Sequence, residues 1–435
     1  MEMRKFTSLV LAAAMGAGLL AGCGSSSSTS SSAASSTSTA ASVVTDTTSA
    51  AASTAGTTTT ASSGDTFKIG VIGPLTGGAS AYGTAVLYGA QVAANEINAA
   101  GGINGYQVEI VSADDENDAQ KSVNCYNTLK DKGMQILAGT VTSNPCIAVA
   151  DYTKEDNMFQ ITPSGSAEKC IANDNVFRTC FADPEQGTLS ADYMSENKLG
   201  KKVGIIYDQS DSYSSGIHDA FVKEAKKDGL DVVSDEAFNA DNKTDFSVQI
   251  QAAQDAGADI LFLPFYYTEA SLVLQQAKKM NYSPLFFGCD GMDGILTVDG
   301  FDKSLAEGLM LMAPFSASAT DEKTQAFDTA YEKLSGGEAP NQFGADEYDT
   351  LYAIKAAAEK ENVTPSMSVS DICEAMKKGM TEIQISGLTS DSITWDKSGA
   401  PTKSPRVYVI KNGEYVEEST SSDSAATSTT ASAAS

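Results

Sequence analysis

The chain contains Phe67-Lys68-Ile69-Gly70-Val71-Ile72, an apolar run that predicts a buried strand. Apolar side chains then recur at helical spacing between residues 84 and 98, and Gly101-Gly102 ends that pattern as glycine does beyond a helix C-terminus. This unit of strand and helix is repeated along the chain. Strands that alternate with helices of about 10–15 residues are typical of parallel sheets covered on both faces.

The repeated pattern forms two series, one on each side of Pro184, and therefore predicts two similar lobes. Further strands are expected at 106–111, 135–138, 158–161, 203–207, 231–233, 260–263, 285–287, 392–395 and 407–410, and helices at 118–129, 145–156, 214–227, 246–256, 268–280, 320–334, 345–361 and 370–378. Asn412-Gly413 is typical of the centre of a hairpin turn.

The N-terminus has the pattern of a secretory signal. Two basic residues precede an apolar stretch that is too short to span a bilayer comfortably, and the stretch ends in Leu20-Ala21-Gly22-Cys23. This tetrapeptide resembles a bacterial lipobox. We therefore expect a signal peptide over 1–22, a lipid on Cys23, and a bacterial protein anchored to the cell membrane on its extracytoplasmic side.

Low-complexity segments flank the body of the chain. Residues 24–64 and 419–435 consist almost entirely of Ser, Thr and Ala, which cannot bury enough surface to fold. We expect a lipid-anchored disordered tether over 23–64 and a disordered tail over 419–435. The body between them, 65–418, is long enough for two domains.

The chain is strongly acidic and contains several cysteines. Its 29 Lys and Arg residues stand against 56 Asp and Glu residues, a balance that opposes binding of nucleic acid. Lipidation of Cys23 leaves six cysteines in a context that permits disulfides. The nearest pairings are Cys125–Cys146 and Cys170–Cys180, although six cysteines allow fifteen connectivities.

Polar and aromatic side chains follow six of the predicted strands, and the carboxyl ends of parallel strands are where such sheets bind ligands. Ser143 lies at a predicted helix start, where backbone N–H groups attract a carboxylate. Asp290 supplies the negative charge that an ammonium group needs. We expect a free amino acid as the ligand. The candidate ligand-binding residues are Tyr82, Ser143, Ser164, Ser166, Tyr213, Tyr266 and Asp290.

Several segments in order carry a family resemblance, among them 69–77, 101–105, 160–166, 205–208, 213–216 and 394–396. Together they resemble the extracytoplasmic solute-binding proteins of ABC transporters, in the leucine/isoleucine/valine-binding type of periplasmic-binding-protein fold type I. The resemblance implies an α/β fold with two Rossmann-like lobes, whose parallel central sheets are joined by a three-crossover hinge. Lobe 1 would comprise 65–183 and 314–389, and lobe 2 would comprise 184–313 and 390–418.

The resemblance also implies residue roles. Ser143 falls at a carboxylate-binding position, Ser164 at a carbonyl position that receives the ammonium, and Ser166 at a hydroxyl position where threonine is usual. Tyr82, Tyr213 and Tyr266 fall at aromatic positions, and Asp290 at an acidic position where glutamate is usual. The expected function is capture of an amino acid, branched-chain or otherwise small, by a monomer that delivers it to an ABC permease.

Other classes of function fit the sequence less well. The single histidine, His218, is expected on an exposed helix face, and neither a G-x-S-x-G elbow nor a phosphate-binding glycine loop occurs. We therefore expect no enzyme, no cofactor and no metal, and we interpret Asp114–Asp118 as a solvated loop and helix cap. An extracellular sensor lipoprotein would share the lobes and the pocket, and a surface adhesion lipoprotein would not need the Ser143/Ser164/Asp290 set.

Overall fold

The computed structural model describes residues 65–418. Within that range no helix is long and apolar enough to cross a membrane. The expected signal peptide, the lipidated Cys23, the tether and the tail all lie outside the described residues.

The first lobe is built on a five-stranded parallel sheet with the strand order β2-β1-β3-β4-β5. Side chains on β1 alternate between its two faces, because Ile69 and Val71 pack toward α1 and α9 whereas Ile72 packs toward α2 and α3. The strands are β1 (Thr66–Gly73), β2 (Gln107–Asp114), β3 (Ile136–Gly139), β4 (Gln160–Thr162) and β5 (Val176–Arg178).

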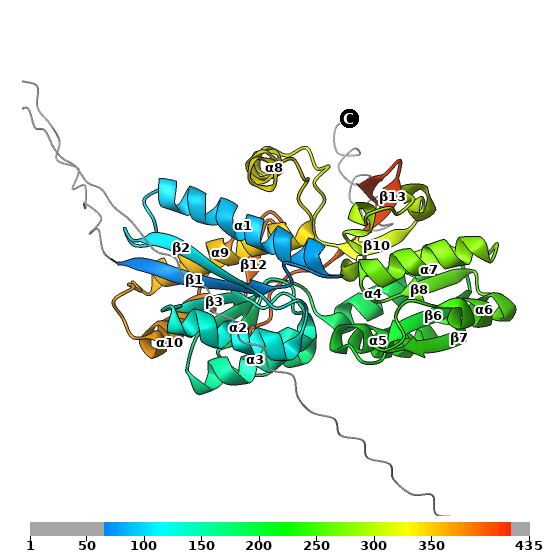
Figure 1. The fold of residues 1–435 in the computed structure, drawn as a ribbon, viewed down its shortest axis with the longest axis horizontal. Helices are drawn as coiled ribbons and strands as arrows, with labels where there is room; N and C mark the ends of the chain where they lie inside the picture. Colours follow the sequence, from blue (N-terminus) through cyan, green and yellow to red (C-terminus); the bar gives the residue numbers. More distant parts are fainter. Residues whose placement is uncertain (1–64, 419–435) are drawn as a thin grey trace, which may run out of the picture. The chain divides into compact units, whose positions relative to one another are not determined.

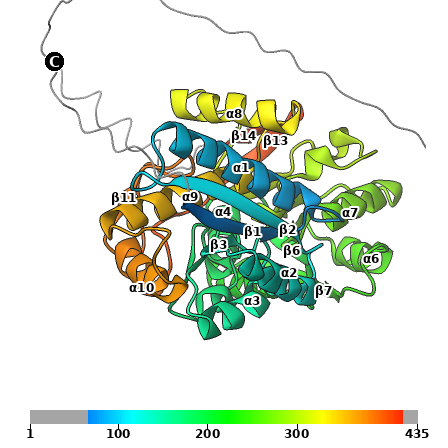
Figure 2. The same ribbon diagram turned by 60° about the vertical axis from the view of Figure 1, so that its left-hand side comes forward.

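Helices cover both faces of this sheet (Figures 1 and 2). The pair α1 and α9 lies on one face and the pair α2 and α3 on the other. Gly89 allows α1 and α9 to pack closely, since a Cβ there would lie 2.1 Å from the carbonyl oxygen of Gly344. The helices of this lobe are α1 (Ser80–Ala99), α2 (Ala119–Asp131), α3 (Ser143–Glu155), η1 (Glu168–Ile171), α8 (Glu322–Ser335), α9 (Gln342–Lys360) and α10 (Val369–Met380).

The second lobe is built on a seven-stranded sheet with the order β14-β13-β10-β9-β8-β6-β7. Its first five strands in sequence are parallel, and β13 and β14 add an antiparallel hairpin with Asn412 and Gly413 at positive φ, which confirms the predicted turn. The strands are β6 (Lys202–Asp208), β7 (Asp231–Phe238), β8 (Ile260–Leu263), β9 (Leu285–Gly288), β10 (Met310–Ala313), β13 (Arg406–Lys411) and β14 (Glu414–Glu417).

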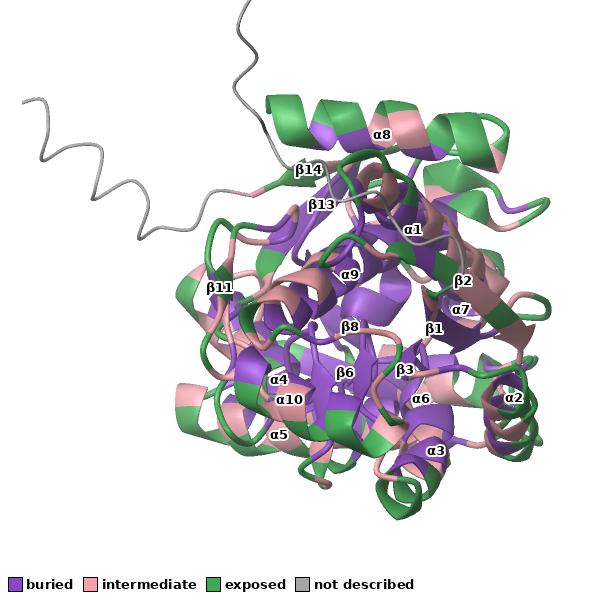
Figure 3. Cartoon of the chain, turned by 90° about the vertical axis from the view of Figure 1, so that its left-hand side faces the viewer, coloured by how far each residue is buried: buried purple, intermediate pink, exposed green. Residues whose placement is uncertain are grey.

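This second sheet is also covered on both faces. On β8, Phe262 packs with Phe221 of α5, whereas Leu261 and Leu263 pack with the α6 and α7 side. The central strands β8 and β10 are therefore fully buried, whereas the edge strands β7 and β14 are not, and the outer helix faces stay exposed (Figure 3). The helices are α4 (Asp183–Glu196), α5 (Ser212–Asp228), α6 (Ser247–Ala256), α7 (Tyr267–Lys279), η2 (Asp290–Met292), η3 (Ile295–Thr297) and η4 (Lys303–Ala306). The two sheets, one parallel and one mainly parallel, confirm the predicted fold class.

The chain passes between the two sheets three times, after β5, after β10 and before β13. Before the last passage, β11 (Gln384–Ile385) pairs with β12 (Ile393–Thr394). The indole N–H of Trp395 then donates to the carbonyl oxygen of Arg178 at 2.7 Å, and the buried Lys403 pairs with Asp346 of α9. Part of the segment 390–418, which the sequence places in lobe 2, therefore contacts the first lobe.

Candidate functional site

The structure brings all seven predicted ligand-binding residues together around one cavity. The volume of the cavity is only about 10 Å³. The cavity therefore holds roughly one water molecule as it stands. Its walls are formed by Tyr82, Val141, Thr142, Ser143, Ser164, Ser166, Tyr213, Tyr266, Asp290, Gly291 and Phe343.

The topology explains why distant residues meet here. Ser143 is the first residue of α3 and follows β3, whereas Ser164 and Ser166 follow β4. On the second lobe Tyr266 follows β8 and Asp290 follows β9. The carboxyl ends of both parallel sheets therefore face one cavity, which is the arrangement expected for a ligand site in α/β proteins.

The first-lobe wall offers unused polar groups. The hydroxyl of Ser164 donates to the carbonyl oxygen of Val141 at 2.6 Å, and that of Ser143 accepts from the N–H of Ala167 at 3.2 Å. The hydroxyl of Ser166 is buried and has no hydrogen-bond partner among residues 65–418. No side chain caps the first turn of α3. A ligand carboxylate would satisfy such groups, because buried polar atoms rarely stay unpaired.

Asp290 carries the main charge on the second-lobe wall. Asp290 is 5% exposed, and burial raises the pKa of its carboxyl group from 3.8 to about 6. Hydrogen bonds from the side chains of Tyr213 and Gln186 act in the opposite direction and lower this pKa. The backbone holds it in place, since its N–H donates to Oε1 of Gln186 at 3.0 Å and its carbonyl accepts from Nε2 of Gln342 at 2.8 Å. At neutral pH the site thus holds a buried negative charge.

Three tyrosines close the cavity. Tyr213 and Tyr266 stack with ring centroids 5.2 Å apart, and Tyr82 meets Tyr266 edge-on at 5.5 Å. The hydroxyl of Tyr82, on α1 of the first lobe, donates to the carbonyl oxygen of Gly291 in the second lobe at 2.5 Å. The N–H of Gly291 in turn donates to the hydroxyl of Tyr213 at 2.9 Å. These contacts hold the two walls together.

The sequence prediction missed two residues near the cavity. Phe343 lies on α9 and its ring centroid is 4.3 Å from that of Tyr82, a contact that no local pattern indicates. Asp183 begins α4, a helix that was not predicted. Neither of its carboxylate oxygens has a partner at hydrogen-bond distance within the described part of the chain. Burial raises the pKa of Asp183, the neighbouring hydroxyl of Ser166 lowers it, and the charge of Asp290 raises it further.

The structure corrects the prediction for His218. This histidine is 9% exposed and not on an open helix face. Its Nδ1 and Nε2 each lie 3.0 Å from a carboxylate oxygen, of Asp219 and Asp235 respectively, and its ring stacks on Tyr207 at 3.8 Å. The ring is therefore a packed structural element of the second lobe.

The predicted cysteine pairs are not formed. All six cysteines between residues 65 and 418 are free thiols. Cys125 donates to the carbonyl oxygen of Asp114 at 3.2 Å and packs against the α2 cluster, whereas Cys146 belongs to a separate buried cluster. Cys170 lies in that same cluster as Cys146, and Cys180 does not.

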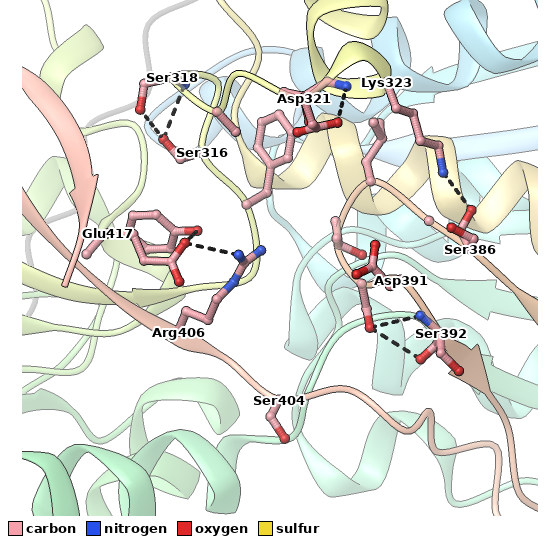
Figure 4. Close-up of a pocket in the computed structure, with 18 of the residues that line it drawn as sticks. Ser316, Ser318, Asp321, Lys323, Ser386, Asp391, Ser392, Ser404, Arg406 and Glu417 are labelled. Carbon is pink, nitrogen blue, oxygen red and sulfur yellow. Dashed lines mark hydrogen bonds and ion pairs between the residues drawn. The ribbon is translucent and has the colours of Figure 1, made fainter. Parts of the chain in front are cut away.

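A larger groove lies elsewhere in this part of the chain and contains none of the predicted residues (Figure 4). Its volume is about 920 Å³, and serine side chains form much of its wall. Three of its charged groups already have partners, since Arg406 contacts Glu417 at 3.0 Å and Lys323 donates to the carbonyl oxygen of Ser386 at 2.6 Å. We place the candidate site at the smaller cavity, where buried polar groups lack partners.

Two parallel sheets with a polar cavity between their carboxyl ends define a two-lobed binding protein. A family model described as "Periplasmic binding protein" matches residues 66–414, and the chain belongs to this family. Its members are extracytoplasmic binding proteins, not enzymes, as the sequence predicted.

Similar proteins agree with this assignment. The chain is 30% identical over 335 residues to Leu/Ile/Val-binding protein homolog 3 of Brucella melitensis, covering 76% of this chain and 88% of the relative. It is 28% identical to the leucine-, isoleucine-, valine-, threonine-, and alanine-binding protein of Pseudomonas aeruginosa, covering 72% and 83%. The branched-chain amino acid transporter substrate binding protein LivJ of Streptococcus pneumoniae, solved with isoleucine, superposes with a TM-score of 0.72 at 27% identity, covering 81% and 100%.

Proposed function

We propose that this protein binds an α-amino acid in the cavity between its lobes and delivers it to the permease of an ABC transporter. The observation that carries the proposal is the convergence of seven separately predicted residues on one cavity with opposite chemistry at its two walls. One wall offers the unpaired hydroxyl of Ser166 and the uncapped first turn of α3, and the other offers a buried carboxylate. A zwitterion matches both walls at once.

Each part of the ligand has a counterpart. The ammonium group pairs with Asp290, and the carboxylate accepts hydrogen bonds from Ser166 and from the first turn of α3. The ligand side chain contacts the remaining apolar wall, to which Val141 and Phe343 contribute. Such a wall favours a small apolar side chain, which agrees with the branched-chain ligands that the names of the relatives give.

Binding requires the lobes to open and close. An amino acid cannot enter a cavity with room for about one water molecule, so the lobes separate to admit it. The hydrogen bond from Tyr82 to Gly291 forms only when the two walls meet. It therefore stabilises the closed state, and side chains that line the cavity must rearrange to make room for a ligand there.

The remaining sequence predictions complete this proposal. Cleavage before Cys23 and its lipidation would anchor a monomer outside the cell, and the segment 24–64 would give it reach toward its permease. Lobe 1 would comprise 65–183 and 314–389, and lobe 2 would comprise 184–313 and 390–418. The exception is the part of 390–418 up to Lys403, which contacts the first lobe.

A thermal-shift screen tests the proposal. The panel contains leucine, isoleucine, valine, alanine and threonine, with two matched controls: 4-methylpentanoate, which is leucine without its ammonium, and 3-methylbutylamine, which is leucine without its carboxylate. A true ligand at a thousand times its dissociation constant adds about 4 kcal/mol, and neither control should shift the melting temperature. Absence of a shift with every α-amino acid would contradict the proposal.

A further inference from the structure

Cys146 and Cys170 are neighbours in the folded protein. Both residues are fully buried, and they form one small cluster with Ala167. Cys146 lies in the first turn of α3 and Cys170 lies in η1, so the cluster joins two segments that are separate in the sequence. These two segments carry the candidate serines of the first-lobe wall, Ser143 and Ser166.

The contacts of the two thiols place them directly behind that wall. The thiol of Cys170 donates to the carbonyl oxygen of Ser143 at 3.6 Å, and Sγ of Cys146 accepts from Nε2 of Gln160 at 3.6 Å. A Cβ on Gly165 would lie 3.2 Å from Sγ of Cys146. Burial, followed by a hydrogen bond and the charge of Cys146, raises the pKa of Cys170, which agrees with two adjacent thiols.

The other described cysteines have different neighbours. Cys125 contacts the backbone of Asp114, and Cys289 lies 3.9 Å from the hydroxyl of Ser190 in the second lobe. Cys373 is on α10 and packs in the core formed by α1 and α9. None of these three belongs to the cluster of Cys146 and Cys170, and neither does the fourth, Cys180, although its charge contributes to the raised pKa of Cys170.

We propose that Cys146 and Cys170 form a disulfide after export, which joins the start of α3 to η1 behind the ligand cavity. The oxidant is a low-molecular-weight disulfide. The thiolate of one cysteine attacks it and releases one small thiol, and the second cysteine thiolate then displaces the other small thiol. Two protons leave the cysteines and two electrons reduce the small disulfide. The extracytoplasmic location of the family supplies the oxidising compartment.

The bridge forms during folding, because a buried thiol with a raised pKa reacts slowly once the lobe has closed around it. Once formed, it fixes the spacing between the Ser143 turn and the loop that carries Ser166. The inference rests on the positions of the two thiols and is independent of the ligand, so it and the proposed function can fail separately.

Oxidative refolding followed by peptide mapping tests the proposal. The full chain is reduced in denaturant, refolded with oxidised and reduced glutathione, alkylated and digested with trypsin without reduction. Cleavage after Lys132, Lys154, Lys169, Arg178 and Lys198 puts Cys146, Cys170 and Cys180 on the separate peptides 133–154, 170–178 and 179–198. The expected product links 133–154 to 170–178 with the loss of two hydrogen atoms.

Matched variants give a second readout. The bridge closes a loop of about 25 residues, so the melting temperature of the refolded wild type should fall by roughly 5 °C on reduction. Cys146→Ala and Cys170→Ala should each abolish this difference, whereas Cys125→Ala should keep it. A 170–178 to 179–198 product, or alkylated Cys146 and Cys170 in the refolded wild type, would overturn the proposal.

Discussion

Replacing Asp290 by asparagine should weaken ligand binding and stabilise the ligand-free protein at the same time. The side chain keeps its shape and most of its hydrogen-bonding capacity but loses its charge. Because burial raises the pKa of Asp290 from 3.8 to about 6, its ionisation in the folded state costs about 3 kcal/mol at pH 7.5. The Asp290→Asn variant would avoid that cost, which corresponds to a rise of about 4 °C in melting temperature for a body of this size.

The sign of this stability effect follows from the pKa. A raised folded-state pKa means that the carboxyl group favours the folded state fully below pH 3.8, and that this contribution is lost as the pH rises through about 6. The advantage of Asp290→Asn should therefore shrink to about 1 kcal/mol at pH 4.5. Binding should change in the opposite direction, since leaving an ammonium unpaired costs about 2–5 kcal/mol, or roughly 30- to 5,000-fold in affinity.

Asp293→Asn is the matched control. Asp293 lies three residues away, is equally buried, and burial raises its pKa to about 6, but it does not line the cavity. Calorimetric titration with the best ligand and melting curves at pH 7.5 and 4.5 measure both effects. Unchanged affinity in Asp290→Asn, or an equal loss in Asp293→Asn, would refute the assignment of Asp290 to the ammonium.

Three further predictions concern the same body. Ligand affinity should fall about tenfold per pH unit below pH 6, because protonation of Asp290 removes the partner of the ammonium; a flat calorimetric profile between pH 4.5 and 7.5 would contradict this. Tyr82→Phe loses the hydrogen bond to Gly291 and should weaken binding roughly fivefold through faster dissociation, measured by stopped-flow fluorescence. Lys403→Met leaves the carboxylate of Asp346 buried and unpaired. It should lower the free energy of unfolding, measured in urea, by about 3–5 kcal/mol. A loss below about 1 kcal/mol would show that the pair is dispensable.

Local patterns were sufficient to predict most of the fold. The alternation on β1 and the Asn412-Gly413 turn depend on neighbouring residues, and both appear as expected. The whole of helix α4 was missed, because it has a weak apolar periodicity and depends on its packing against α5. Short strands such as β5 and β10 lack a periodic signal of their own.

The candidate site residues that come directly after a strand could be predicted from the sequence. Ser143 and Asp290 could be assigned because parallel topology gathers such positions at one edge. Phe343 could not, since it reaches the cavity from α9 through tertiary packing alone. His218 and the cysteines show the same limit, because the partners of a side chain depend on how helices rotate against a sheet and not on the spacing of residues along the chain.

The buried pair of Lys403 and Asp346 determines where the last connection between the sheets can bend. Lys403 is fixed to α9, and Arg406 already belongs to β13. Only Ser404 and Pro405 lie between these two anchors, and the ring of Pro405 fixes one of the backbone torsions. While both anchors hold, this connection can bend only at these two residues, so its length and its proline limit how far the ends of α9 and β13 can move apart at this point.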